Sequence, residues 1–245
     1  MMKILICGNG NIGKHLEKEL SVNKNIDIKI YDKYKNSNNS VGLDYLKFDF
    51  MFICVPTEKL EDGRADTSEV EDCISKFSNQ CDTIIIKSAV PVGTAEKIGR
   101  KNVIISPEYW GTTQHCPEPN FLILGGEREY RDKVVQLYNT IKNGYYKYYF
   151  TDWKTAELVK YMENSWIATK VTFCNEFNKI AKAYGISYAE LRELWLADSR
   201  VSPSHTLIYD DAPDFSNSHC LSKDVPALIK MCEDNELEVP LLKSL

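Results

Sequence analysis

Three groups of residues in this sequence have types and spacings suited to chemistry. The first is a glycine-rich run, Gly8-Asn9-Gly10-Asn11-Ile12-Gly13, which directly follows an apolar segment. The second is the pair Lys160 and Asn164, and the third is a cysteine with charged neighbours, His219-Cys220-Leu221-Ser222-Lys223-Asp224. Together they offer a phosphate cradle, two hydrogen-bond donors for an oxygen, and a sulfur nucleophile.

The glycine run matches the dinucleotide-binding pattern because a predicted strand precedes it and a predicted helix follows it. Its first glycine permits a tight turn, its second lets the backbone approach a pyrophosphate, and its third lets helix and strand pack closely. Asp32 ends the next predicted strand about 20 residues later, where a carboxylate accepts hydrogen bonds from ribose hydroxyls and repels the 2′-phosphate of NADP. Lys33 offsets part of that repulsion, so the sequence predicts NAD as a preference over NADP.

Further cofactor contacts are expected in the loops after the third and fourth strands, since ligands of such sheets bind beyond the carboxyl ends of the strands. By local composition alone, these Pro- and Gly-containing segments are more typical of ordinary turns. The predicted cofactor-binding residues are Gly8, Gly10, Asn11, Ile12, Gly13, Asp32, Lys33, Val55, Pro56, Thr57, Ser88 and Ala89.

Lys160 and Asn164 are one turn apart on a predicted helix and therefore point the same way. An ammonium and an amide side by side can hold a substrate hydroxyl or stabilise a developing oxyanion. Cys220 has cationic neighbours close to a predicted helix start, which are conditions that favour a thiolate. By spacing alone, a solvated surface face for the pair and core filling for the cysteine are the more frequent roles.

The elements that must position these residues follow from the hydrophobic pattern. Short β-branched segments predict buried strands, and amphipathic helices alternate with them, which indicates right-handed crossovers and a parallel, doubly wound sheet. The predicted strands are Lys3–Cys7, Ile26–Tyr31, Phe48–Val55, Thr83–Lys87, Val103–Ser106, Phe121–Leu124 and Tyr145–Phe150. The predicted helices between them include Ile12–Leu20, Ser68–Phe77 and Tyr130–Ile141.

The pattern changes near residue 152. Apolar residues recur at helical spacing from Trp153 to Tyr184 without Gly or Pro, which predicts one helix with Thr151 or Asp152 as N-cap and Gly185 as its end. About 30 residues give a helix of about 45 Å, long enough to connect domains and to contact a partner subunit. Shorter helices are expected over 188–196 and 223–232. The expected fold class is therefore α/β: a Rossmann-like domain over 1–151, then a long central helix and a small helical domain over 152–245.

Composition excludes several function classes. Hydrophobic residues make up 43% and charged residues 27%, and the net charge is −5, so the chain is globular and a nucleic-acid-coating role is disfavoured. No apolar run approaches the roughly 18–20 residues that span a membrane, and no signal-peptide pattern opens the sequence. The eight cysteines contain no C-x-x-C pair, so neither zinc nor disulfides are expected. These features predict a cytoplasmic protein without a metal or a membrane partner.

Several segments in order resemble the UDP-glucose/GDP-mannose dehydrogenase family of nucleotide-sugar 6-dehydrogenases, over nearly the whole chain. They are Gly8–Gly13, Lys87–Thr94, Ser106-Pro107-Glu108, Ala156–Lys160 with Asn164, Asn175-Glu176, Asp198-Ser199-Arg200 and Cys220–Asp224. The resemblance implies that a nucleotide sugar, a UDP-sugar first of all, is oxidised at its 6-hydroxyl to a carboxylate in two NAD-dependent hydride transfers. It also implies a homodimer through the long helix and a place in polysaccharide biosynthesis.

The resemblance also implies residue roles. Cys220 is expected to capture the aldehyde as a thiohemiacetal, which is then oxidised to a thioester. Lys160 and Asn164 are expected to stabilise the oxyanion, Asp224 to assist proton transfer and water, and Glu108 to assist thioester hydrolysis. The substrate-binding residues so implied are Glu108, Tyr109, Trp110, Lys160, Asn164, Lys223 and Arg200, the last of which often reaches across the dimer.

The sequence also departs from this family. Ala89 replaces a threonine, Thr112 a second glutamate, Ser222 a proline, and 216–219 a glycine-rich loop. Family members also carry a third, nucleotide-binding domain, whereas this sequence ends at Leu245. Two alternatives therefore stay open: a non-catalytic NAD-binding homologue, and a two-electron 3-hydroxyacid dehydrogenase, which needs no nucleophilic cysteine.

Overall fold

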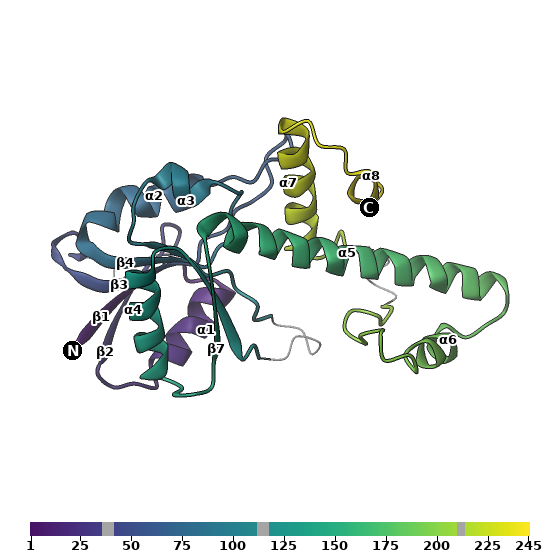
Figure 1. Ribbon diagram of the computed structural model, residues 1–245, viewed down its shortest axis with the longest axis horizontal. Coiled ribbons are helices and arrows are strands. Elements are labelled where there is room, and N and C mark those ends of the chain that lie inside the picture. The colour runs from purple at the N-terminus through teal and green to yellow at the C-terminus, as the bar shows by residue number, and fades with distance from the viewer. Residues whose placement is uncertain (36–41, 112–117, 210–213) are drawn as a thin grey trace. The chain divides into compact units, whose positions relative to one another are not determined.

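The computed structural model describes residues 1–35, 42–111, 118–209 and 214–245, and the chain divides into two compact units (Figure 1). Unit 1 comprises Met1–Glu58 and Ala65–Lys160, and unit 2 comprises Lys59–Arg64 and Tyr161–Leu245. The division falls inside the long helix α5 (Trp153–Ala183). The short segment 59–64, which follows the third strand in sequence, belongs to unit 2.

Unit 1 is built on a seven-stranded sheet with the strand order β2-β1-β3-β4-β5-β6-β7. The strands are β1 (Met2–Cys7), β2 (Ile26–Tyr31), β3 (Phe48–Ile53), β4 (Cys81–Ile86), β5 (Val103–Ile105), β6 (Phe121–Gly125) and β7 (Lys147–Thr151). Neighbouring strands pair in parallel except β5 and β6, which are antiparallel. A parallel pair needs a crossover connection, usually a helix, and the described residues between β5 and β6 form none.

Helices cover both faces of this sheet (Figure 1). On one face, α2 (Ser68–Phe77) and α3 (Thr94–Ile98) contribute Val70, Cys73, Phe77 and Ala95 to one core cluster. On the other, α1 (Asn11–Leu20) and α4 (Arg128–Asn139) contribute Leu16, Leu20, Val134 and Leu137 to a second cluster. Two 3-10 turns, η1 (Leu43–Tyr45) and η2 (Ser78–Gln80), complete the connections. The predicted doubly wound α/β class is confirmed, with a sheet that is mostly parallel.

The strand register places the carboxyl ends of five strands at one edge of the sheet. Cys7 is paired with Tyr31 and Ile53, Ile53 with Ile86, and Ile86 with Ile105, and all of these are final residues of their strands. The loops that follow these strands therefore emerge side by side. This edge is where an open α/β sheet binds its ligand.

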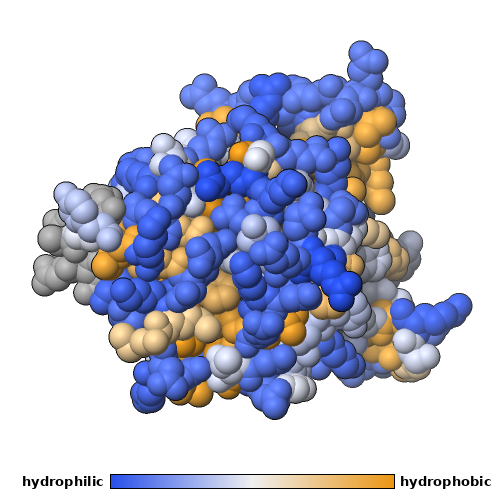
Figure 2. All heavy atoms as spheres, turned by 60° about the vertical axis from the view of Figure 1, so that its left-hand side comes forward, coloured by the Kyte–Doolittle hydropathy of each residue, from blue (hydrophilic) through white to orange (hydrophobic). Residues whose placement is uncertain are grey.

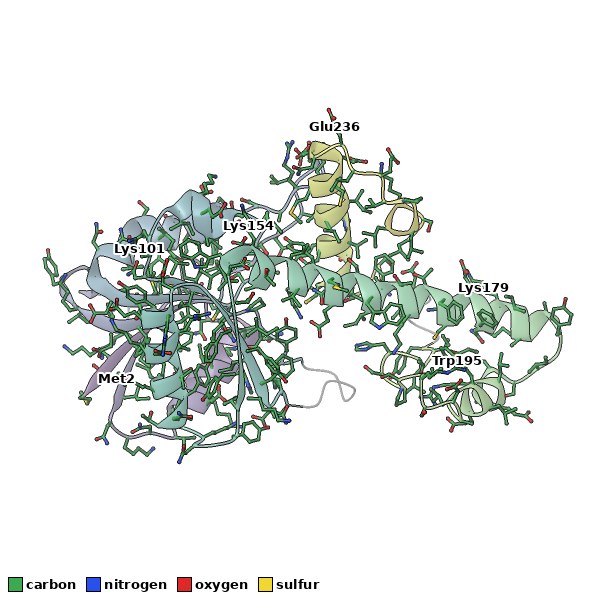
Figure 3. The ribbon with its side chains drawn as sticks, viewed as in Figure 1. Met2, Lys101, Lys154, Lys179, Trp195 and Glu236 are labelled. Carbon is green, nitrogen blue, oxygen red and sulfur yellow. The ribbon has the colours of Figure 1, made fainter. Side chains whose placement is uncertain are left out.

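Helix α5 begins and ends at its predicted signals. The Asp152 carboxylate accepts a hydrogen bond from the Thr155 N–H at 2.9 Å, which identifies Asp152 rather than Thr151 as the N-cap. Gly185 follows the helix with φ of 68°, a left-handed conformation that costs glycine little. Figure 3 labels Lys154 at the start of this helix and Lys179 in its last third.

Unit 2 contains α6 (Tyr188–Trp195), α7 (Leu221–Asp234) and α8 (Pro240–Lys243) beside the larger part of α5. Leu221 and Val225 of α7 pack on Ala168 of α5. The Trp195 ring of α6, labelled in Figure 3, lies 5.7 Å from the Phe173 ring of α5. These contacts fix α6 and α7 against the helix that carries Asn164.

The face in Figure 2 is mostly hydrophilic, with hydrophobic side chains gathered in smaller areas. Among the residues that the structure describes, no helix is both long enough and apolar enough to cross a membrane.

Candidate cofactor and catalytic site

The glycine run forms the turn between β1 and α1, and its geometry explains each glycine. Gly8 has φ of +100°, and a Cβ there would lie 2.5 Å from the Cys54 carbonyl oxygen. A Cβ on Gly13 would lie 1.9 Å from the Gly8 carbonyl oxygen, so these two glycines are required by the chain's own packing. A Cβ on Gly10 would meet no atom within 4 Å, so the turn is open at this point. Gly10 is also the N-cap of α1 and offers no side chain to cap it, which leaves the helix N–H groups for a phosphate.

Asp32 lies beside this turn, directly after β2. One carboxylate oxygen accepts a hydrogen bond from the Asn9 N–H at 2.8 Å, and the other accepts from the Tyr34 and Lys35 N–H groups at 3.0 Å each. Partial burial raises the pKa of Asp32, but these three backbone bonds outweigh it and hold that pKa below its ordinary value. The carboxylate is therefore ionised and oriented, as ribose binding requires.

A shallow pocket opens next to Asp32, and the about 290 Å³ of empty space in it includes open solvent. Its lining combines predicted cofactor residues with four that sequence reasoning missed. The predicted ones are Gly8, Asp32, Lys33, Val55 and Pro56, and the missed ones are Tyr31, Tyr34, Glu69 and Cys73. Glu69 and Cys73 come from α2, and nothing in the helix pattern distinguishes them from their neighbours.

The two loops predicted to line the cofactor site are hydrogen-bonded to each other. The Ser88 hydroxyl donates to the Val55 carbonyl at 2.6 Å, and the Thr57 hydroxyl donates to the Ala89 carbonyl at 2.7 Å. The structure thus brings all the predicted cofactor-binding loops to one edge of unit 1. Their contacts with a cofactor stay a prediction.

Glu108 is held in a buried ion pair that the sequence did not reveal. Its carboxylate lies 3.1 Å from the Lys87 ammonium, with side chains only 16% and 2% exposed, and also accepts from the Tyr109 and Trp110 N–H groups at 2.8 and 2.7 Å. Burial raises the pKa of Glu108, but the Lys87 charge and these bonds together lower it below its ordinary value. Lys87 is the first residue of the Lys87–Thr94 segment, yet no feature of the sequence indicates that its charge is directed to Glu108.

Lys160 lies in the same unit as Glu108. Its ammonium is 4.5 Å from the centre of the Tyr109 ring, a cation–π geometry, and the Tyr109 ring in turn packs on Phe121 with 4.8 Å between ring centres. Trp110 stacks on the His15 imidazole of α1 with 4.1 Å between ring centres. Three predicted substrate-binding residues, Tyr109, Trp110 and Lys160, are thus each held by a ring contact within unit 1.

A buried glutamate joins the start of α5 to the loop after β4. The Glu157 carboxylate accepts hydrogen bonds from the Gly93 and Ala95 N–H groups, at 2.6 and 2.8 Å. Burial raises the pKa of Glu157 despite these two bonds. This contact fixes the predicted cofactor loop to the first turn of the helix that carries Lys160.

In unit 2, the remaining catalytic candidates gather at the start of α7. The Asn164 amide donates to one Asp224 oxygen at 2.6 Å, and the Lys223 ammonium donates to the other at 2.6 Å. Asn164 and Asp224 are buried, whereas Cys220 is the exposed N-cap residue of α7, one turn before Asp224. The dipole of this helix favours negative charge at the cysteine's position.

Arg200 is not part of this group. Its exposed guanidinium binds the Asp198 carboxylate, with Nε 3.0 Å from each oxygen.

The loop 216–219, which stands where the family has a glycine-rich loop, caps the start of α7. The Ser218 hydroxyl accepts a hydrogen bond from the Leu221 N–H at 3.3 Å. Thr112 lies outside the described residues, and within them no cluster of three His, Cys, Asp or Glu side chains could hold a metal.

Comparison with known proteins matches two family models along the chain. Residues 16–141 match the NAD binding domain of the UDP-glucose/GDP-mannose dehydrogenase family, and residues 154–245 match the central domain of that family.

Individual relatives agree with these matches. A UDP-glucose 6-dehydrogenase of Rickettsia prowazekii is 27% identical and covers 99% of this chain and 56% of its own length. A UDP-N-acetyl-D-mannosamine dehydrogenase of Methanocaldococcus jannaschii is 31% identical over 78% of this chain and 47% of its own length. The chain thus spans about half the length of these relatives.

A solved UDP-glucose dehydrogenase of Pyrobaculum islandicum aligns with a TM-score of 0.82 at 20% identity, covering 100% of this chain and 67% of that one. This likeness shows the fold.

Proposed function

The chain belongs to the UDP-glucose/GDP-mannose dehydrogenase family and carries its NAD-binding domain, and we propose that it oxidises the 6-hydroxyl of a nucleotide sugar to a carboxylate. The preferred substrate class is a UDP-sugar, in keeping with the names of several relatives. The observation that carries the proposal is the buried network in which Asn164 and Lys223 hold the Asp224 carboxylate one helical turn from the exposed Cys220.

The residues around the glycine turn fit NAD. The open position at Gly10 admits a pyrophosphate to the N-terminus of α1, and the ionised Asp32 carboxylate can accept hydrogen bonds from the adenosine ribose. When bound, NAD would supply the oxidising power, with one hydride accepted by each of two molecules. Asp32 and the loops at Val55 and Ser88 would hold the cofactor in place.

Side chains of this chain would stabilise the negative oxygen, form the carbon–sulfur bond and take up the protons. Lys160 and Asn164, one turn apart on α5, would donate hydrogen bonds to the sugar oxygen while it carries negative charge. The first oxidation takes the alcohol to an aldehyde, with loss of a hydride and a proton. The Cys220 sulfur then forms a bond to the aldehyde carbon and gives a thiohemiacetal.

The second half of the reaction releases the acid. Loss of a second hydride and a proton converts the thiohemiacetal into a thioester, and water then breaks the carbon–sulfur bond to give the carboxylate and the thiol. Asp224 would take up protons during these steps, and Glu108, which Lys87 keeps ionised, would assist the attacking water. The overall reaction consumes two NAD and one water for each carboxylate formed.

We also propose that two copies of the chain pair through α5. Large apolar side chains of its unit 2 part are exposed along the helix, with Met162 72% and Trp166 62% exposed. They recur at Met162, Trp166, Phe173, Phe177 and Ile180, and Tyr184 continues the series directly after the helix. Such a row is unusual for a surface that faces only water, and pairing of two helices would bury it.

The test is an assay with NAD and a panel of UDP- and GDP-sugars in which NADH and sugar carboxylate are both measured. The proposal expects two NADH for each carboxylate with at least one sugar, and a loss of acid formation in Cys220→Ala. Binding of NAD without turnover of any sugar would instead identify a non-catalytic homologue. Full turnover by Cys220→Ala to the same product would favour a two-electron hydroxyacid dehydrogenase.

A further inference from the structure

The pocket beside Asp32 contains a second carboxylate whose partners suggest a role in choosing the cofactor. Glu69 lies in the first turn of α2 and lines this pocket together with Lys33 and Tyr34. One Glu69 oxygen accepts hydrogen bonds from the Lys33 ammonium at 3.1 Å and from the Tyr34 hydroxyl at 2.6 Å. The polar groups of the two residues that follow Asp32 are therefore both directed to Glu69.

Lys33 lies where a cation could bind the phosphate that distinguishes NADP from NAD, so its contact with Glu69 bears on cofactor choice. In Rossmann domains, a cation close to the end of the second strand is what accommodates the 2′-phosphate of NADP. Lys33 directly follows Asp32 and its side chain is 44% exposed, so it could reach a phosphate at this place. Its hydrogen bond to the Glu69 carboxylate raises the pKa of Lys33.

We propose that Glu69 is a specificity-determining residue that makes the pocket select NAD over NADP by engaging Lys33. The inference rests on the proposed function in that it takes this pocket to hold the adenosine ribose of the cofactor.

Two electrostatic effects would both weaken the binding of NADP at this pocket. A 2′-phosphate carries nearly two negative charges at neutral pH, and the pocket wall would present the charges of both Asp32 and Glu69 to it. The Glu69 carboxylate, 3.1 Å from the Lys33 ammonium, offsets part of the positive charge that would attract such a phosphate. The next cation along the chain, Lys35, is held at the glycine turn, where its ammonium donates to the Asn9 carbonyl at 2.5 Å.

Tyr34 links Glu69 to the ribose site. Its hydroxyl donates to Glu69, while its N–H donates to the Asp32 oxygen at 3.0 Å. Glu69 therefore also helps to hold the segment that orients Asp32. Truncation of Glu69 would release both Lys33 and the Tyr34 hydroxyl toward an incoming phosphate.

The experiment measures dissociation constants of the full chain for NADH and NADPH by fluorescence titration, without any sugar. In Glu69→Ala, the preference for NADH over NADPH is expected to fall about tenfold, equivalent to about 1.4 kcal/mol. Glu69→Gln, which keeps the side-chain volume, is expected to shift the preference in the same direction. In the double variant Lys33→Gln/Glu69→Ala, the preference is expected to return toward that of the unmodified chain.

Glu71→Ala is the matched control. Glu71 lies in the same turn of α2 and also pairs with a lysine, Lys97 at 2.9 Å, but does not line the pocket. The inference is overturned if Glu69→Ala shifts the preference no more than Glu71→Ala does, or if the shift is equally large without Lys33. If the unmodified chain binds neither dinucleotide, the proposed function fails as well, whereas binding of NADH with an unchanged preference in Glu69→Ala rejects this inference alone.

Discussion

The Lys87–Glu108 pair provides a strong test of the site's electrostatics. Lys87→Met keeps a side chain of similar length but leaves the Glu108 carboxylate in its buried position without a counter-charge. Removal of one partner from a buried ion pair typically costs about 3 kcal/mol or more, because the other charge stays desolvated. For a unit of this size, that loss corresponds to a fall in Tm of roughly 6–12 °C.

The loss of unfolding free energy caused by Lys87→Met should depend on pH, in a direction set by the pKa of Glu108. Lys87 and two backbone bonds hold the pKa of Glu108 below its ordinary value, so the stability that they contribute is present above that ordinary pKa and disappears as the pH falls through the lowered one. Lys87→Met removes the part of this contribution that comes from the Lys87 charge. The difference in unfolding free energy between the two proteins should therefore be largest near pH 7 and should shrink toward about pH 4.

Thermal and urea unfolding at several pH values measure this difference. Lys97→Met is the control, since its pair with Glu71 is exposed at 76% and 50% of the two side chains and should contribute at most about 1 kcal/mol. Adding Glu108→Gln to Lys87→Met should restore much of the stability, because it removes the isolated charge. A cost below about 1 kcal/mol that does not change with pH would refute the reasoning.

Three further predictions concern the turn, the α5 contact and the dimer. Gly13→Ala should destabilise the protein by about 1–3 kcal/mol and weaken NADH binding in a fluorescence titration, since its Cβ would overlap the carbonyl of the first glycine. Glu157→Ala should cost about 2–4 kcal/mol in urea unfolding, because the Gly93 and Ala95 N–H groups lose their acceptor. Trp166→Glu should convert a dimer into a monomer in sedimentation at micromolar concentration; an unmodified chain that is already monomeric there would contradict the proposed pairing.

The sequence predicted most of the architecture, because hydrophobic periodicity and caps are local signals. Strand β2 and helix α2 have the predicted bounds, and Asp152 and Gly185 mark the two ends of α5 as expected. The antiparallel pairing of β6 with β5 was not predicted, since strand direction depends on the path of the connection rather than on the strand's own residues. The short helix α3 was also missed, because five residues give too little periodicity to detect.

In the candidate site too, the residues with a local sequence pattern were predicted, and their long-range partners were not. Glycines and an acid at fixed spacing identified the nucleotide turn, since each is required by the backbone geometry of that turn. The partners of the predicted residues were not accessible from sequence: Lys87 meets Glu108, and Lys33 meets Glu69, only because separate strands and helices converge at one sheet edge. The long-range contacts that tune charge are thus the part that required the structure.

The central claim is that the Cys220 sulfur carries the sugar during oxidation. The most direct measurement is mass spectrometry of the peptide containing Cys220, after the full chain has reacted with NAD and a UDP-sugar and has been quenched in acid to preserve a thioester. The account predicts that Cys220 gains the mass of the sugar-nucleotide carboxylic acid less one water, while Cys232 of α7 stays unmodified. Formation of sugar carboxylate with Cys220 unmodified throughout turnover, or with the adduct on another residue, would contradict it.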